Sequence, residues 1–267
     1  MEIRQIKPEE IPLVKDFPPP DWQLDIPVVC NYYSGEPYFY FAIALVNNTV
    51  AGTGMAFMNT DTAWLGAIIV KETFRRQGIG YRITSHLVDR SRSSGCRNVL
   101  LVATDMGSSV YEKLGFKISS YYLVYKNGRM PDNDSGNSIM KMNLNDLEEV
   151  ISIDKKVSGE DRGKIIRKTL MTGYKHVSEN TISGYYLPDF GHGLIIATDE
   201  TAGEELLKFR YARDKSRVAI PESNKPAIRF LEENGFKEYA RYPRMYLGDE
   251  VSWQPEMIYS RGSGYLG

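Results

Sequence analysis

The stretch from Ile68 to Arg92, IIVKETFRRQGIGYRITSHLVDRSR, decides the fold of the first half of the chain. An apolar strand ends at Val70, and a glycine-containing loop follows it. Apolar residues at Ile83, Leu87 and Val88 then recur at helical spacing. The first backbone N–H groups of a helix have no partner within the helix, and the helix dipole adds partial positive charge there. This order of strand, loop and helix therefore predicts an anion site.

The loop favours a pyrophosphate ligand. Gly78 and Gly80 carry no Cβ, so the backbone can come close to an anion. Local positive charge comes from four side chains, Lys71, Arg75, Arg76 and Arg82. A dinucleotide-binding fingerprint needs a third glycine where Ile83 stands, and a P-loop needs a Gly-Lys-Ser/Thr sequence that this stretch lacks.

Two motifs resemble the GNAT superfamily of N-acyltransferases. The spacing of Arg75, Gly78 and Gly80 is similar to the loop that binds the pyrophosphate of acetyl-CoA in that superfamily. The segment Val110–Phe116, VYEKLGF, resembles its later motif, in which a helix carries a tyrosine and ends at Gly-Phe. The resemblance covers residues 1–126 and implies acetyl-CoA as co-substrate, without a metal.

Further segments of the first half alternate between strand and helix patterns. The expected strands are Tyr38–Val46, Thr49–Phe57, Ala63–Val70, Arg97–Ala103 and Tyr121–Tyr125, and the expected helices are Gly80–Arg92 and Ser109–Leu114. A turn at Asn47-Asn48 should join the first two strands as a hairpin. This alternation predicts a mixed α/β domain.

The second half contains a faint copy of the first. Arg97–Lys117 and Arg217–Lys237 align without a gap, and both end in Gly-Phe-Lys. Between the halves lies a stretch rich in Gly, Pro, Asn, Asp and Ser. We therefore expect two tandem GNAT-like domains, at residues 1–126 and 139–267, joined by a linker at 127–138. Each should be a mixed, mostly antiparallel twisted sheet flanked by helices.

The C-terminal half resembles the second, GNAT-like domain of a two-domain subgroup of acetyltransferases. Asn224–Ala227, Asn234–Phe236, Arg244-Met245 and the ending Gly264–Gly267 carry this likeness. The half nevertheless lacks the loop, because Val70 and Arg97 are 27 positions apart whereas Ala197 and Arg217 are 20 apart. Acidic residues stand there instead, namely Asp199, Glu200, Glu204 and Glu205, and they would repel a pyrophosphate. We predict that this half does not bind CoA in the manner of the family.

The resemblance assigns roles in the first half. It places the pyrophosphate on the backbone N–H groups of Gln77, Gly78, Ile79, Gly80 and Tyr81, beside Arg75 and Arg76. It places the pantetheine arm along Ile68, Ile69 and Val70, with an N–H near Ile69 polarising the thioester carbonyl. Tyr111 matches the general acid that protonates the departing thiolate, and a tyrosine of the core is its alternative role. In the second half Leu231 stands opposite this tyrosine.

No general base stands out from the sequence. Glu72, Asp61, Asp105 and His86 are candidates by type and neighbourhood only, and the pattern favours a solvated charge or, for His86, a residue on a helix surface. Cys96 lacks a paired base, which argues against a covalent nucleophile. The aromatic segment Pro18–Tyr40 could contact the acceptor or pack against the second domain.

The composition excludes some classes of protein. Formal net charge is −1, so no whole-chain field attracts nucleic acid or an anionic membrane. The N-terminal residues show no signal pattern, and no apolar run reaches the roughly 20 residues that span a bilayer. Cys30 and Cys96 indicate free thiols, so we expect a cytoplasmic protein.

The expected activity is transfer of an acetyl group to an amine of a small-molecule acceptor, by direct attack in a ternary complex. A transferase for longer acyl-CoA and a non-catalytic acyl-CoA sensor are the alternatives, and a nucleic-acid binder is disfavoured. The sequence leaves the acceptor's identity and the oligomeric state open.

Overall fold

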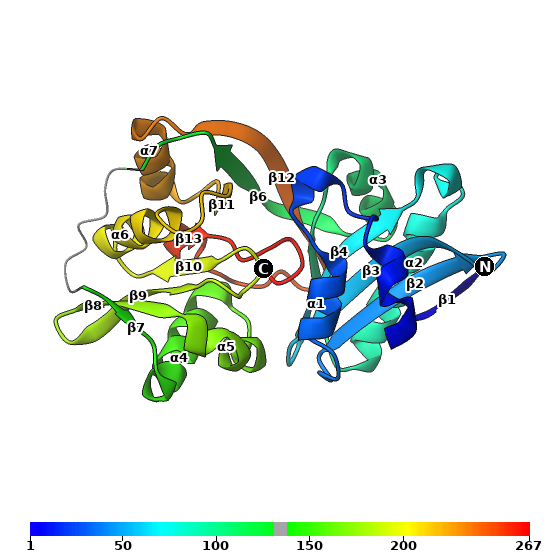
Figure 1. Ribbon diagram of the computed structural model, residues 1–267, viewed down its shortest axis with the longest axis horizontal. Helices are drawn as coiled ribbons and strands as arrows, with labels where there is room; N and C mark the ends of the chain where they lie inside the picture. The colour runs from blue at the N-terminus through cyan, green and yellow to red at the C-terminus, as the bar shows by residue number, and fades with distance from the viewer. Residues whose placement is uncertain (131–137) are drawn as a thin grey trace. The chain divides into compact units, whose positions relative to one another are not determined.

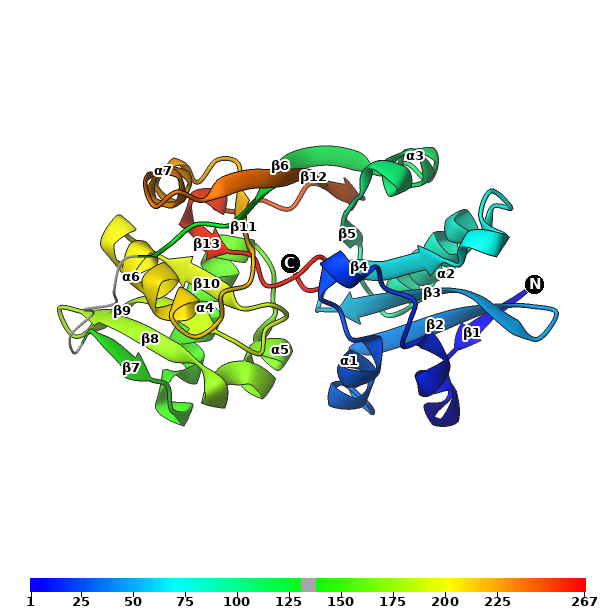
Figure 2. The same ribbon diagram turned by 45° about the horizontal axis from the view of Figure 1, so that its top comes forward.

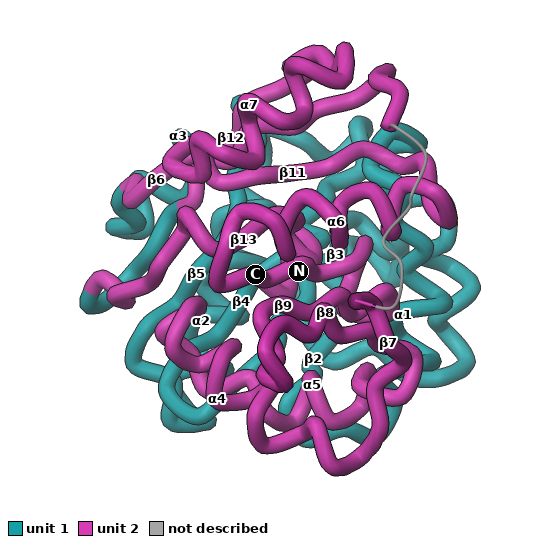
Figure 3. The backbone as a smooth tube through the Cα atoms, turned by 90° about the vertical axis from the view of Figure 1, so that its left-hand side faces the viewer, with its two compact units in different colours: residues 1–117, 245–249 teal, residues 118–244, 250–267 magenta. Residues whose placement is uncertain are grey.

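The computed structural model describes residues 1–130 and 138–267 (Figure 1). Contacts divide the chain into two compact units, coloured separately in Figure 3. Unit 1 comprises residues 1–117 and 245–249, and unit 2 comprises residues 118–244 and 250–267. Most of the expected linker, residues 131–137 of 127–138, lies outside the described residues.

This division differs from the expected one at residue 126. Strand β6 (Lys117–Lys126) pairs antiparallel with β11 (Val218–Pro221), from Val218 opposite Tyr125 to Pro221 opposite Tyr122. In unit 2 it also runs alongside β12 (Lys237–Leu247), as Figure 2 shows. Residues 118–126 therefore belong with the second unit, while the end of β12 and the two residues after it, 245–249, are counted with the first.

Unit 1 is a mixed sheet with helices, as the sequence predicts. Its strands are β1 (Glu2–Gln5), β2 (Phe39–Val46), β3 (Thr49–Met58), β4 (Thr62–Val70) and β5 (Asn98–Val102). Its α-helices are α1 (Ile26–Tyr32), α2 (Ile79–Ser93) and α3 (Asp105–Lys113), with 3-10 turns at Pro8–Val14, Pro20–Trp22 and Glu72–Phe74. The strand order is β1-β2-β3-β4-β5, antiparallel except for the parallel pair β4 and β5.

The predicted hairpin between β2 and β3 is confirmed. Asn47 and Asn48 have φ of 48° and 60°, the left-handed conformation that a two-residue hairpin turn requires. Asparagine tolerates this conformation better than other residues with a Cβ. Helix α3 begins at Asp105, four residues before the expected start. Thr104, which precedes the helix, has extended backbone angles, so the helix begins directly after the turn from β5.

Small residues on β3 let α2 approach the sheet closely. A Cβ added at Gly52 would lie 2.8 Å from Ile83 Cδ1, and one at Gly54 would lie 2.7 Å from Ile83 Cγ2. Ile79, Ile83 and Leu87 are accordingly buried against the sheet. This packing fixes the position of α2, and with it the loop at its N-terminus.

Unit 2 has a second sheet, with the order β13-β10-β9-β8-β7 and all pairs antiparallel. Its strands are β7 (Ile139–Lys141), β8 (Tyr174–Ser178), β9 (Thr181–Leu187), β10 (Leu194–Ala197) and β13 (Ile258–Ser260). Its α-helices are α4 (Leu147–Ser158), α5 (Gly163–Thr169), α6 (Glu200–Tyr211) and α7 (Lys225–Glu233), with 3-10 turns at Leu144–Asp146, Leu170–Thr172 and Pro255–Met257.

The predicted internal repeat is visible as a repeated strand and helix. Strand β11 and helix α7 in unit 2 correspond to β5 and α3 in unit 1. Each helix is followed by a glycine with positive φ, 92° at Gly115 and 76° at Gly235. A glycine adopts this conformation without a Cβ penalty, so it ends both helices at the same point of the repeat.

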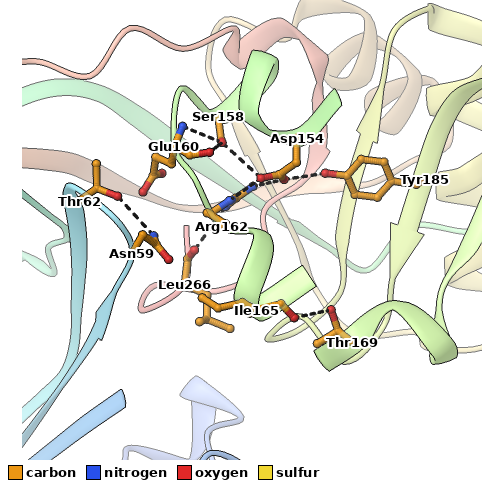
Figure 4. A network of polar contacts seen from close by, with 10 residues as sticks. All are labelled: Asn59, Thr62, Asp154, Ser158, Glu160, Arg162, Ile165, Thr169, Tyr185 and Leu266. Atoms are coloured by element: carbon orange, nitrogen blue, oxygen red, sulfur yellow. Dashed lines mark hydrogen bonds and ion pairs between the residues drawn. The ribbon is translucent and has the colours of Figure 1, made fainter. Parts of the chain in front are cut away.

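A buried ion pair holds α4 and β9 together in unit 2 (Figure 4). Arg162 donates from Nη2 to Asp154 Oδ1 at 2.6 Å and from Nε to Oδ2 at 3.0 Å. The Tyr185 hydroxyl donates to the same carboxylate at 2.6 Å, and the backbone oxygen of Leu266 accepts from Arg162 Nη1. Both charges are almost fully buried, so the pair needs these additional hydrogen bonds.

Candidate active site

The far end of β4 is distorted by a β-bulge. The pairing of β3 with β4 shifts between Thr53 opposite Ile69 and Met55 opposite Gly66. Within the bulge Ala67 has φ of 48°, and its carbonyl accepts a hydrogen bond from Thr53 Oγ1 at 2.9 Å. Bulges bend a strand and occur often beside functional sites. The bulge contains Ala67 and Ile68, so it includes the start of Ile68–Val70, the strand segment that the resemblance assigns to pantetheine.

Strands β4 and β5 part at the same level. Their parallel pairing runs from Thr62 opposite Asn98 to Leu65 opposite Leu101, whereas β4 continues to Val70. Beyond Leu65 the edge of β4 that faces β5 carries backbone groups available to an extended ligand, which could pair as an added strand. Ile69 is 9% exposed, while Ile68 and Val70 are half-buried and pack against the core.

The glycine loop and the start of α2 follow immediately. Gly78 is the N-cap of α2 and has φ of 72°. The first backbone bond of the helix runs from Arg82 N to Gly78 O at 3.1 Å, so the N–H groups of Ile79, Gly80 and Tyr81 precede it. A Cβ at Gly78 would meet nothing within 4 Å, which shows open space around the turn. The geometry is that of an anion site at a helix N-terminus.

The predicted arginines lie around this loop. Arg75, Arg76, Gln77 and Tyr81 are exposed. Arg75 also donates from Nε to the Val70 carbonyl at 3.2 Å, which ties the loop to the end of β4. Arg76 has φ of 60°, an uncommon conformation for a residue with a Cβ. Such conformations are found preferentially at ligand-binding turns.

Tyr111 lies on the last turns of α3 with its side chain directed back along the helix. A Cβ built at Gly107, one turn earlier, would be 3.2 Å from the Tyr111 hydroxyl oxygen. The hydroxyl is therefore near the start of α3, the helix that follows β5 in the chain. The residue is 8% exposed, and burial raises the pKa of Tyr111 to about 12. The phenol is protonated at neutral pH, as a general acid must be.

The candidate bases differ in position. Asp61 precedes β4, and its carbonyl accepts from Arg97 and Asn98 at the start of β5. Parallel strands have their carboxyl ends at the same edge, so Asp61 is at the opposite edge from the opening. His86 bonds the Tyr40 hydroxyl through Nε2 at 3.0 Å, and burial lowers the pKa of His86. Asp105 is in the first turn of α3, on the side of the Tyr111 hydroxyl.

The cysteines are protonated at neutral pH. Burial raises the pKa of Cys96 to about 11 and that of Cys30 to about 12. A thiol that stays protonated is a poor nucleophile. Both residues are buried and free, in agreement with the sequence reasoning.

Most of the aromatic segment before β2 belongs to the core of unit 1. Tyr33, Tyr38 and Tyr40 are buried, and the ring of Tyr33 lies edge-on to Phe57 with centroids 4.7 Å apart. Tyr32 is 39% exposed, and its ring lies edge-on to that of Tyr33. The aromatic richness of this segment therefore serves packing first.

In unit 2 the equivalent opening is filled by protein. Strand β13 pairs with β10, with Ile195 opposite Ser260 and Ile196 opposite Ile258. It also contacts β11, because the N–H of Arg261 donates to Ala219 O at 2.8 Å. The strand thus occupies the gap that corresponds to the parting of β4 and β5 in unit 1. Sequence reasoning missed this insertion, because a three-residue strand far along the chain carries no local signal of its partner.

The start of α6 in unit 2 is also occupied. The side chain of Asp199 caps the helix, accepting from Ala202 N at 2.8 Å. A carboxylate at this point uses the same donors that an anionic ligand would need. Leu231, which stands at the position of Tyr111 in the repeat, is fully buried and offers no proton.

Within the described residues no group of three or more His, Cys, Asp or Glu side chains has an arrangement suited to a metal ion. None of the helices in residues 1–130 and 138–267 combines the length and apolar character needed to cross a bilayer.

Comparison with known proteins agrees with the fold of both units. The sequence profile described as "Acetyltransferase (GNAT) family" matches residues 5–116, and the profile "Acetyltransferase (GNAT) domain" matches residues 150–260. A search of curated proteins by sequence gave no significant match.

Solved structures share the fold at low sequence identity. A candidate acetyltransferase from Pyrococcus horikoshii is 21% identical with a TM-score of 0.81, covering 100% of this chain and 95% of its own. A GCN5-related N-acetyltransferase from Sphaerobacter thermophilus is 13% identical with a TM-score of 0.61, covering 98% and 96%. A tandem GNAT protein from the clavulanic acid biosynthesis pathway is 14% identical with a TM-score of 0.61, covering 94% and 99%.

Proposed function

Because the chain belongs to the GNAT acetyltransferase family and carries a domain of that family in each half, we propose that unit 1 transfers an acetyl group from acetyl-CoA to an amine of a small-molecule acceptor. The observation that carries the proposal is the open edge of β4 followed directly by the start of α2. One element offers backbone groups to the pantetheine arm, and the other offers N–H groups to the pyrophosphate.

The amine attacks the thioester directly. Its lone pair forms the new C–N bond at the acetyl carbonyl carbon, and the C–S bond breaks. A backbone N–H near Ile69 supports the negative charge on the carbonyl oxygen during this step. Holding both reactants together lowers the barrier by up to roughly 7–11 kcal/mol.

Tyr111 protonates the departing thiolate in this proposal. Its raised pKa keeps the proton available at neutral pH, and its hydroxyl is near the start of α3, the helix that follows β5. The proton lost by the amine passes to a base or to water. Asp105 is the candidate base that shares the α3 start with the Tyr111 hydroxyl.

Unit 2 does not bind CoA in this account. The insertion of β13 beside β10 and the cap by Asp199 occupy the two features that unit 1 uses. The free, buried cysteines suit a reducing compartment, so we place the activity in the cytoplasm.

The test is incubation with acetyl-CoA and a panel of amines, followed by measurement of free thiol. Arg76→Glu should weaken CoA binding about tenfold or more, a loss of about 1.4 kcal/mol, because it reverses a charge beside the pyrophosphate. Arg92→Glu is the matched control, since Arg92 is also exposed but lies at the other end of α2. Equal CoA affinity in wild type and Arg76→Glu would contradict the assigned loop. CoA binding without turnover of any amine would indicate an acyl-CoA sensor.

A further inference from the structure

Unit 2 contains a cavity of about 490 Å³ that is independent of the acetyl-CoA site in unit 1. It lies between the end of β7, the start of β8, the loop after β9 and the residues after α6. Its lining residues are Lys141, Thr172, Tyr174, Tyr186, Pro188, Gly191, His192, Arg213 and Asp214. The volume is in the range of pockets that hold small organic ligands.

Two cations and two aromatic rings face this cavity. Lys141 Nζ lies 4.3 Å from the centroid of the Tyr174 ring, and the guanidinium carbon of Arg213 lies 5.6 Å from the same centroid. Tyr174 and Tyr186 are stacked at 18°, with centroids 6.3 Å apart. The cavity therefore brings aromatic rings and positively charged side chains together.

Further positive charge is close enough to affect His192, a residue that lines the cavity. Arg210 is 1% exposed, and its ion pair with Asp214 is long, 3.7 Å. Arg261 has Nε and Nη1 buried without a hydrogen-bond partner among residues 1–130 and 138–267. Burial, together with Arg217, Arg261 and Arg210, lowers the pKa of His192 to about 4. Buried charges are screened by salt much less than exposed ones, so this field reaches the cavity.

The acidic residue of the cavity is already engaged. Asp214 accepts from the N–H of Ser216 at 2.9 Å and from its hydroxyl at 2.8 Å. Lys141 makes one hydrogen bond, to Thr172 O at 2.8 Å, and retains two further donors. Arg213 donates from Nη1 to Phe209 O at 3.0 Å and has other N–H groups in its fork. The net charge offered to a ligand is positive.

We propose that this cavity binds a small aromatic anion, a planar ring that bears a carboxylate or a phosphate. The ring lies against Tyr174 and Tyr186, and the anionic group is held by Lys141 and Arg213. Charge-assisted hydrogen bonds to lysine and arginine fit either group, so both carboxylate and phosphate are suitable. A neutral ring would gain the stacking contact alone.

Isothermal titration of the full chain tests the proposal with phenyl phosphate and benzoate as probes. Inorganic phosphate and benzyl alcohol serve as the anion without a ring and the ring without a charge. At least one aromatic anion should bind about tenfold more tightly than either control, which corresponds to one charge-assisted hydrogen bond. Stronger binding of phenyl phosphate than of benzoate would identify phosphate as the favoured group, and the reverse would identify carboxylate.

Variants locate the binding. Lys141→Gln and Arg213→Gln should each weaken it about tenfold. Arg229→Gln is the matched control in unit 2, because Arg229 is exposed and forms its ion pair with Glu200 away from the cavity. Circular dichroism and urea unfolding establish that each variant is folded.

Two results would overturn the proposal. One is the absence of saturable binding of both aromatic anions at millimolar concentration. The other is binding that Lys141→Gln and Arg213→Gln leave unchanged. If Arg76→Glu abolishes binding instead, the probe occupies the loop of unit 1, and the cavity in unit 2 is not its site.

Discussion

Alanine at Gly78 and at Gly80 should have opposite effects on stability. Gly78 has φ of 72°, and an L-residue in this left-handed conformation costs about 1–2 kcal/mol. Alanine also loses less conformational entropy than glycine on folding, which returns roughly 0.4–1 kcal/mol. The net loss in the free energy of unfolding for Gly78→Ala is therefore about 0.8 kcal/mol, within a range of about 0–1.6 kcal/mol.

Gly80 is inside the first turn of α2, where its φ is not positive. A Cβ there would lie 3.7 Å from Val70 Cγ2, an ordinary van der Waals contact. Alanine favours a helix over glycine by about 0.5–1 kcal/mol, so Gly80→Ala should raise the free energy of unfolding by that amount. In the GNAT loop motif that this sequence resembles, the position of Gly80 can be glycine or alanine. Gly80→Ala should therefore still bind CoA.

Urea unfolding measures the two stabilities, and calorimetric titration measures CoA affinity. Gly78→Ala should also weaken CoA binding several-fold, because its strained turn reorients the N–H groups at the start of α2. Equal changes in the free energy of unfolding, in the same direction for both variants, would contradict these expectations. They would also be contradicted if Gly78→Ala binds CoA as tightly as wild type while Gly80→Ala does not.

Other consequences of the structure can be measured on single variants. Tyr111→Phe should slow turnover with little change in CoA affinity. Burial raises the pKa of Tyr111 from 10 to about 12, so the stability that this protonated group contributes is full below pH 10 and is lost between pH 10 and 12. The phenylalanine variant should lack that loss of stability. Asp154→Ala should lower the free energy of unfolding by about 3–5 kcal/mol, because it leaves a buried arginine unpaired. Glu148→Ala, at an exposed ion pair of 3.8 Å, should stay within about 0.5 kcal/mol in the same urea titration. A hydrogen bond from Arg4 lowers the pKa of Glu10 from 4.5 to about 2, so the stability that ionised Glu10 contributes is present above pH 4.5 and is lost as the pH falls to 2. In Glu10→Gln the free energy of unfolding should therefore fall less steeply between pH 4.5 and 2. An unchanged pH dependence in this range would contradict the assignment.

The strand, the glycine loop and the helix start of the candidate site in unit 1 could be predicted from sequence, because they are contiguous. A strand, a glycine loop and a helix start lie within Ile68–Arg92, and their backbone geometry follows from local residue types. Whether these residues bind acetyl-CoA stays a prediction. Tyr111 was found through a second local motif, and the position of its hydroxyl near the start of α3 had to come from the structure.

The bulge at Ala67 was not predictable in the same way. Its sequence shows an ordinary apolar strand, and the left-handed backbone at Ala67 depends on Thr53 from the neighbouring strand. The expected domain boundary at residue 126 was drawn from the composition of the residues that follow it. Strand β6, which ends at this point, pairs instead with β11, almost a hundred residues later in the sequence. The residue pattern of one strand does not indicate which distant strand it pairs with.

The sequence by itself determined the local backbone features of this protein. These are the hairpin turn at Asn47-Asn48, the start of α2 at Gly78, and the ends of two helices at Gly115 and Gly235. These depend on the allowed backbone angles of a few adjacent residues. The tertiary structure alone decided that β4 and β5 part beyond Leu65, that β13 fills the corresponding gap in unit 2, and that Lys141 and Arg213 both lie close to the Tyr174 ring. Those features arise from packing between segments far apart in the chain. Their stabilising free energy comes from contacts between two segments, and neither segment provides it alone.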